Sequence, residues 1–220
     1  MNGAVAFTDD SLNPVVRGFW HLPENANGDG LVLTHGAGSD CNAPLLVALS
    51  LTFAERGYVV LRCDLPFRQK KRFGPPSFGN GELDRAGLAN AVTVLRKNVA
   101  GRIFLGGHSY GGRQATMLGA DEPELVAGLL LLSYPLHPPR KPEQLRTKHF
   151  PNLHTSSLFV QGTRDPFGSV EEMTEALRLI PAKNELMVVE GAGHDLGFKG
   201  KERAAQFPGM VLAKFQAMFG

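Results

Sequence analysis

Ser109 lies in a pattern that is typical of a nucleophile presented on a sharp turn. Residues 107–111 read Gly-His-Ser-Tyr-Gly, which matches G-x-S-x-G, and they follow the apolar run at 102–107. In this pattern the serine stands between a strand and a helix that approach each other closely. The amides at the start of the helix favour negative charge that develops there. The sequence therefore predicts a nucleophilic Ser109, against the simpler interpretation of a glycine-rich structural turn.

A serine hydroxyl needs a base to take its proton before it can attack a carbonyl. The chain has seven histidines, so position must choose among them. His194 lies in a glycine-flanked loop after the last expected strand, where we expect the base, and the alternative is a loop histidine in solvent. His108 adjoins the serine in a strained turn, and we expect it to point elsewhere. We expect His35, which ends a strand, to brace the next loop through hydrogen bonds.

The base in turn needs a carboxylate that fixes its tautomer and stabilises its charged form. Asp165 follows the expected strand 157–162, and the order serine, aspartate, histidine along the chain suits such a site. Asp195 is adjacent to the histidine and would be sterically awkward, and Asp64 is a more distant alternative. Asp165 could also serve only as a turn former before Pro166. We predict that Asp165 orients His194.

Two backbone N–H groups are candidates for an oxyanion hole. The first belongs to Tyr110, the residue after the expected nucleophile. The second belongs to Ala37, in the His-Gly-Ala-Gly stretch that follows the expected strand 31–35. Gly36 would let the backbone come close to a substrate. A tight turn that needs glycine would show the same residues, so the sequence leaves that alternative open.

Other side chains near these positions could contact a substrate. Arg113 lies four residues after Ser109 and could bind a substrate carboxylate, or it could form an ion pair across helices. Tyr134 and Phe167 could wall an apolar pocket, although packing alone also explains them. The basic stretch 68–81 could attract an anionic ligand, and the alternative is a solvated loop.

Short apolar runs alternate with amphipathic stretches along the chain, which is typical of a mainly parallel sheet with helices on both faces. Ser169 and Glu172 form a capping-box pattern that predicts a helix start. The segment 125–134 is apolar throughout, as expected for a central strand buried on both faces. The expected strands lie at 15–20, 31–35, 58–63, 102–107, 125–134, 157–162 and 185–191, and the expected helices at 43–57, 82–100, 110–120, from 169 onward and at the end of the chain.

Composition narrows the class of protein. At 220 residues the chain fits one domain, 1–220, and its net charge of +2 does not indicate a nucleic-acid partner. The two cysteines form no disulfide framework, and we find no secretory signal and no run of 18 apolar residues. These features predict a cytoplasmic protein without a membrane partner, and they leave the oligomeric state open. No metal-binding motif and no nucleotide-binding loop is found, so we expect no metal and no cofactor.

Taken together, these motifs resemble those of one family over nearly the whole chain. Five stretches of the chain are similar to those of compact α/β-hydrolases: LTHGAGSD, LGGHSYGGRQ, LSYPLHPP, LFVQGTRDPFG and GAGHDLG. The branch in question contains bacterial dienelactone-hydrolase-like proteins and the testis-expressed hydrolase-like proteins of animals, together with a subunit of a chromatin acetyltransferase complex. The resemblance implies the α/β-hydrolase fold and supports Ser109, Asp165 and His194 as the positions of a catalytic triad. The chain itself shows no insertion large enough to be a separate lid domain. True dienelactone hydrolases use a cysteine nucleophile, so the serine here does not carry over their substrate.

The function expected from these residues is that of a serine hydrolase. Ser109, Asp165 and His194 would cleave an ester-like bond, carboxylester or thioester, of a small acyl substrate through an acyl-enzyme. A serine peptidase would use the same residues, and only a comparison of ester with amide substrates separates the two. The alternative from another class is a binding or scaffold protein that keeps the fold without turnover.

Overall fold

The computed structural model describes residues 3–77, 79–198 and 201–220 and contains one eight-stranded sheet. Its strands are short, and most of them contain β-branched or aromatic residues, which favour the pleated, half-buried surface of a sheet. In chain order they are β1 (Val5–Asp9), β2 (Val16–His21), β3 (Gly30–Thr34), β4 (Val59–Cys63), β5 (Ile103–His108), β6 (Gly128–Leu132), β7 (Ser157–Gly162) and β8 (Asn184–Val189).

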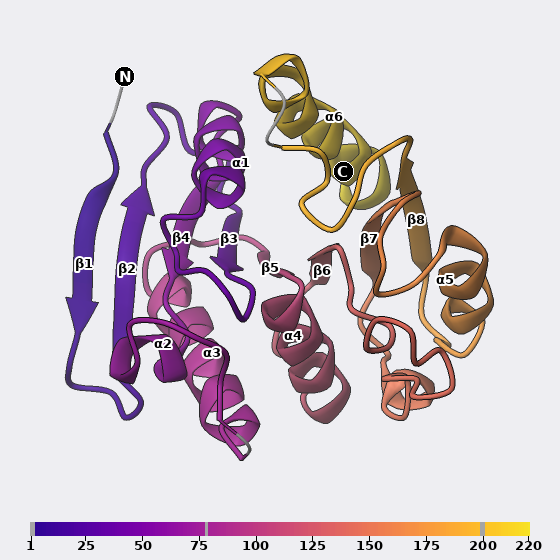
Figure 1. The fold of residues 1–220 in the computed structure, drawn as a ribbon. Helices are drawn as coiled ribbons and strands as arrows, with labels where there is room; N and C mark the ends of the chain where they lie inside the picture. The colour runs from indigo at the N-terminus through magenta and orange to yellow at the C-terminus, as the bar shows by residue number, and fades with distance from the viewer. Residues whose placement is uncertain (1–2, 78, 199–200) are drawn as a thin grey trace.

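The strands follow one another across the sheet in the order β1-β2-β4-β3-β5-β6-β7-β8 (Figure 1). Strand β2 runs antiparallel to both of its neighbours, whereas β4, β3, β5, β6, β7 and β8 are all parallel. Parallel strands end at one edge of the sheet, so the loops after β3, β5, β7 and β8 lie along the same edge. Ligands of open parallel sheets bind outside this edge.

Helices cover both faces of the sheet. Helices α1 and α6 pack on one face, and α3, α4 and α5 pack on the other, so two apolar clusters form on opposite sides (Figure 1). Strand β6, whose sequence is Gly-Leu-Leu-Leu-Leu, is buried along its whole length, as predicted. The helices are α1 (Pro44–Glu55), α2 (Pro66–Lys70), α3 (Gly81–Arg96), α4 (Tyr110–Asp121), α5 (Val170–Leu177) and α6 (Lys201–Phe219).

The predicted fold class is confirmed, and the departures are local. The capping box at the start of α5 is present, because Ser169 Oγ accepts from the N–H of Glu172 and the Glu172 carboxylate accepts from the N–H of Ser169. Strand β1 and the short helix α2 were not predicted from the sequence. No separate lid domain occurs in the described residues, and no helix among them is long and apolar enough to cross a membrane.

The crossing of β5 and α4 is tight. A side-chain carbon added at Gly107 would lie 2.5 Å from the backbone carbon of Gly111, and one added at Gly111 would lie 2.5 Å from the carbonyl oxygen of His35. These neighbours are backbone atoms, which cannot turn away as the end of a side chain can. Glycine is therefore required at both positions, and the turn between them is fixed by the sheet and the helix together.

We expect Gly107→Ala to lower the free energy of unfolding by about 1–3 kcal/mol, because its methyl group overlaps backbone on α4. Gly209→Ala is the matched control, since an added carbon there has open space in α6 and alanine favours helix by roughly 1 kcal/mol. Urea unfolding of the two variants measures the difference. Equal stabilities would contradict the tight crossing.

Candidate active site

Ser109 occupies the turn between β5 and α4 with an unusual backbone conformation. Its φ is 51° and its ψ is −115°, and its N–H donates to the carbonyl of Leu132 at the end of β6 over 2.8 Å. A residue with a side chain rarely adopts a positive φ, because this conformation costs free energy. It persists only where the surrounding structure holds the backbone in place. Here the tight crossing below the turn and the bond to β6 hold the serine at the edge of the sheet.

Three residues from three strand ends form a chain of hydrogen bonds at this edge. His194 Nε2 lies 2.8 Å from Ser109 Oγ, and His194 Nδ1 lies 2.8 and 3.0 Å from the two carboxylate oxygens of Asp165. A carboxylate only accepts hydrogen bonds, so Nδ1 carries the proton of the neutral ring. The lone pair on Nε2 then faces the serine hydroxyl. This arrangement can take a proton from Ser109 and stabilise the resulting imidazolium.

The aspartate is enclosed, and the histidine remains accessible. The Asp165 side chain has no exposed surface, whereas 24% of the His194 side chain is exposed. Phe167 supports both residues, because its N–H donates to Asp165 Oδ1 over 2.9 Å and its ring lies 4.3 Å from the His194 ring between centroids. Phe167 is thus beside the pair, and its predicted contact with a substrate stays a prediction.

The loop after β3 approaches the serine closely. A side-chain carbon added at Gly36 would lie 3.3 Å from Ser109 Cβ and 3.0 Å from His108 Nδ1. Neither Ala37 N–H nor Tyr110 N–H donates a hydrogen bond to any other residue in the described part of the chain. Tyr110 begins α4, and the first N–H groups of a helix lack partners within it. Both candidate donors are therefore available beside Ser109.

His35 fixes the peptide that carries the Ala37 N–H. Its Nδ1–H donates to the carbonyl of Gly36 over 2.8 Å, and its Nε2 accepts from the N–H of Leu65 over 3.0 Å. The Gly36 carbonyl and the Ala37 N–H belong to one planar peptide, so holding the carbonyl aims the N–H in the opposite direction. Burial lowers the pKa of His35, which matches its role as one donor and one acceptor. The expectation that His35 braces this loop is confirmed.

Arg68 holds the same loop from the side of α2. Its side chain is buried, and its guanidinium donates four hydrogen bonds of 2.7–2.9 Å to backbone carbonyls, those of Ala37, Ser39, Lys71 and Gly74. The alternative that the stretch 68–81 presents its charges to an anion does not apply to Arg68, because this guanidinium is already occupied. Sequence analysis missed its structural role, since nothing in the basic run distinguishes the buried arginine from its exposed neighbours.

The His108 side chain forms its hydrogen bond away from the Ser109 hydroxyl, which confirms the prediction. Its Nε2–H donates to the carbonyl of His194 over 2.9 Å, so the side chain supports the loop that carries the expected base. Burial lowers the pKa of His108 to about 4. His108 is therefore neutral near pH 7, and its proton is used in a structural hydrogen bond.

Of two predicted substrate contacts, the structure contradicts that of Tyr134 and does not test that of Arg113. Tyr134 is fully buried, its hydroxyl donates to the carbonyl of Arg146 over 2.7 Å, and its ring packs on Phe150. The proposed contact of Tyr134 with a substrate is therefore wrong, because the ring belongs to the core behind the site. Arg113 forms no ion pair with any described residue, and its buried Nε has no hydrogen-bond partner. Its alternative interpretation as an ion pair across helices is thus not supported.

Asp84 was not predicted, although the sequence carried a signal for it. Its carboxylate accepts from the Tyr110 hydroxyl over 2.8 Å and from the N–H of Phe67 over 3.0 Å, and burial raises its pKa. Asp84 lies four residues before Leu88, on the apolar stripe of α3. A carboxylate on a buried helix face needs partners, and here they tie α3 to α2 and to the start of α4.

Of the alternative acids, Asp64 bonds elsewhere: it accepts from the N–H of Cys41 and pairs with Arg17. Asp195 accepts from the N–H of Gly197, and the carboxylate beside His194 Nδ1 is that of Asp165. No group of three or more His, Cys, Asp or Glu residues in the described ranges could hold a metal ion. The expectation that no metal or cofactor is required stays a prediction.

Comparison with known proteins assigns the chain to a family, and the fold described above is the fold of that family. A family model described as an alpha/beta hydrolase domain matches residues 27–211, and the chain belongs to this family.

Among curated proteins, a relative from Escherichia coli (strain K12), provisionally named a carboxymethylenebutenolidase, is 26% identical over 82% of this chain and 77% of its own. Among solved structures, a dienelactone hydrolase from Anabaena variabilis superposes with a TM-score of 0.78, 18% identity and 99% coverage of both chains. A lidless α/β serine hydrolase from Xanthomonas campestris, XC6422, gives 0.74 at 15% identity, covering 100% of this chain and 96% of its own.

The neutral His108 leads to a test by pH. We expect its imidazole signals in ¹H–¹⁵N spectra to keep the neutral form down to pH about 5, since burial opposes the charged form. Histidine in the unfolded chain binds its proton near pH 6.5, so the unfolded state gains protons first and the free energy of unfolding falls as the pH drops from 7 to 5. A His108 midpoint above pH 6 would show that the side chain is not held as described.

Proposed function

We propose that the protein is a serine hydrolase that cleaves a carboxylester or thioester through an acyl-enzyme. The observation that carries the proposal is the chain of hydrogen bonds from Asp165 through His194 to Ser109, each link 2.8 Å at its shortest. The membership in the alpha/beta hydrolase family supports hydrolase chemistry at this edge of the sheet. The name of the Escherichia coli relative, which refers to the opening of a lactone ester, agrees with an ester bond as the target.

In the first half of the reaction, Ser109 Oγ attacks the carbonyl carbon while His194 Nε2 takes the hydroxyl proton. The carbonyl oxygen becomes an oxyanion, which the N–H groups of Ala37 and Tyr110 bind. Asp165 keeps the imidazolium oriented and stabilises its charge. The bond from the carbonyl carbon to the leaving oxygen or sulfur breaks, and His194 passes its proton to that atom.

In the second half, a water molecule gives its proton to His194 and attacks the acyl carbon. The bond to Ser109 Oγ then breaks, the serine regains its proton, and the acid leaves. His35 and Arg68 act as positioning residues, because they hold the loop that presents the Ala37 N–H. Phe167 and Gly36 border the space for the substrate. Arg113, whose Nε has no partner, is the candidate for a substrate carboxylate.

The proposal predicts the effect of removing the nucleophile. In Ser109→Ala the hydrolysis of a p-nitrophenyl ester should fall by about 10⁴–10⁶-fold, because no acyl-enzyme can form. Ser11→Ala is the control, since Ser11 is remote in sequence and its hydroxyl, within the described residues, bonds to Asp9 at the end of β1; this variant should keep full activity. A loss below tenfold in Ser109→Ala would mean that another group attacks the ester.

A further inference from the structure

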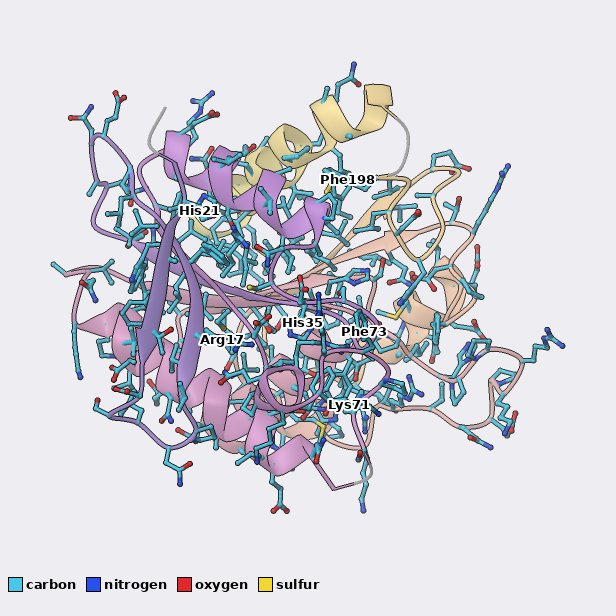
Figure 2. All side chains as sticks on the ribbon, turned by 60° about the vertical axis from the view of Figure 1, so that its left-hand side comes forward. Arg17, His21, His35, Lys71, Phe73 and Phe198 are labelled. Carbon is cyan, nitrogen blue, oxygen red and sulfur yellow. The ribbon has the colours of Figure 1, made fainter. Side chains whose placement is uncertain are left out.

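An apolar pocket of about 360 Å³ borders the candidate active site on the face of the sheet that α1 and α6 cover. Its wall consists of the loop after β3, the first turn of α1, His108, and the segment that follows His194. Figure 2 labels two of its residues, His35 and Phe198. Other wall residues include Ser39, Ala43, Leu46 and Asp195. The volume lies within the range of small-molecule sites, which are mostly apolar with a few polar groups.

Several wall residues of this pocket are neighbours, along the chain, of the residues that take part in the proposed reaction. His108 directly precedes Ser109, and Asp195 directly follows His194. Ser39 closes the loop that presents the Ala37 N–H, and the same loop comes within 3.3 Å of Ser109 Cβ at Gly36 when a side-chain carbon is built there. Wall residues are therefore chain neighbours of the nucleophile and of the base, and one of them belongs to the loop of the proposed oxyanion hole.

We propose that this pocket binds the apolar acyl chain of the substrate, so that the preferred substrates are esters of unbranched acids of about six to eight carbons. This inference rests on the function proposed above. After Ser109 Oγ has bonded to the acyl carbon, the leaving alcohol departs with the proton from His194, and the acyl group alone stays attached. The part of the substrate that persists through both half-reactions is the part that benefits from an apolar wall.

The position of the carbonyl favours the acyl chain over the alcohol. In the proposed reaction the Ala37 N–H binds the carbonyl oxygen, and the same loop continues to Ser39 in the pocket wall, so one of the two groups on the carbonyl carbon lies beside the wall. The alcohol oxygen must instead face His194 Nε2, and 24% of the His194 side chain is exposed. At roughly 30 Å³ for a water-sized group, the pocket has room for on the order of ten such groups, so an acyl chain of six to eight carbons fits inside it.

The test is a series of p-nitrophenyl esters from acetate to dodecanoate. For the wild-type protein, kcat/KM should rise about fourfold for each added methylene up to six to eight carbons, because each buried methylene contributes a constant transfer free energy. Ala43→Trp places a large ring in the pocket from its rim. This variant should lose at least tenfold on the octanoate ester and less than threefold on the acetate ester.

Two variants control this result. Leu51→Trp adds a ring at an exposed position of the same helix, outside the pocket, and should keep the wild-type profile. Phe198→Ala removes a half-buried ring from the opposite wall, so its optimum should move to longer acids even where Ala43→Trp fails to fold. A second series, octanoate esters of alcohols from methanol to hexanol, should show little dependence on the alcohol.

The outcomes separate this inference from the function on which it depends. Three results would overturn the acyl pocket and leave the serine hydrolase standing. They are hydrolysis of the acetate ester with no dependence of kcat/KM on acyl chain length, an unchanged optimal chain length in Phe198→Ala, and a dependence of kcat/KM on the length of the alcohol. If the protein hydrolyses no ester of either series and a fluorophosphonate does not label Ser109, both the acyl pocket and the serine hydrolase are overturned.

Discussion

The close crossing of strand β5 and helix α4 is the constraint on which the rest of the site depends. No side chain fits at Gly107 or Gly111, so the backbone between them is forced through a turn with a positive φ at Ser109. This turn places the hydroxyl beyond the edge of the sheet and leaves the first N–H groups of α4 without partners in the helix. The loops after β3, β7 and β8 then need only end at the same edge to reach it.

A second layer of hydrogen bonds holds those loops, and it consists of two neutral histidines and one buried arginine that donates to backbone carbonyls. His35 donates to the loop after β3, and His108 donates to the loop after β8, both with pKa values that burial lowers. Arg68 is charged, but its donors are shared among four backbone carbonyls. Among the three histidines around Ser109, only His194 has a ring nitrogen that faces the serine hydroxyl.

Much of this could be read from the sequence, because the informative residues stand at strand ends. The apolar runs predicted the parallel strands, and the residue that follows each run identified Ser109, Asp165 and His194 as neighbours in space. Tyr134 was misplaced because an aromatic residue after a strand can face the site or the core, and only the packing of the 133–156 segment decides. The role of Arg68 was missed because nothing in the basic run marks this arginine as the buried one. Asp84 was missed although its place on the apolar stripe of α3 signals a buried carboxylate that needs partners.

The central claim is that Ser109 is an activated nucleophile, and the most direct measurement is its reaction with a fluorophosphonate followed by intact mass and peptide analysis. The account predicts one adduct, located on Ser109, and a labelling rate that falls sharply in His194→Gln, which removes the base. Absence of an adduct on Ser109, under conditions in which an established serine hydrolase is labelled, would contradict it. An unchanged labelling rate in His194→Gln would contradict the role of the histidine.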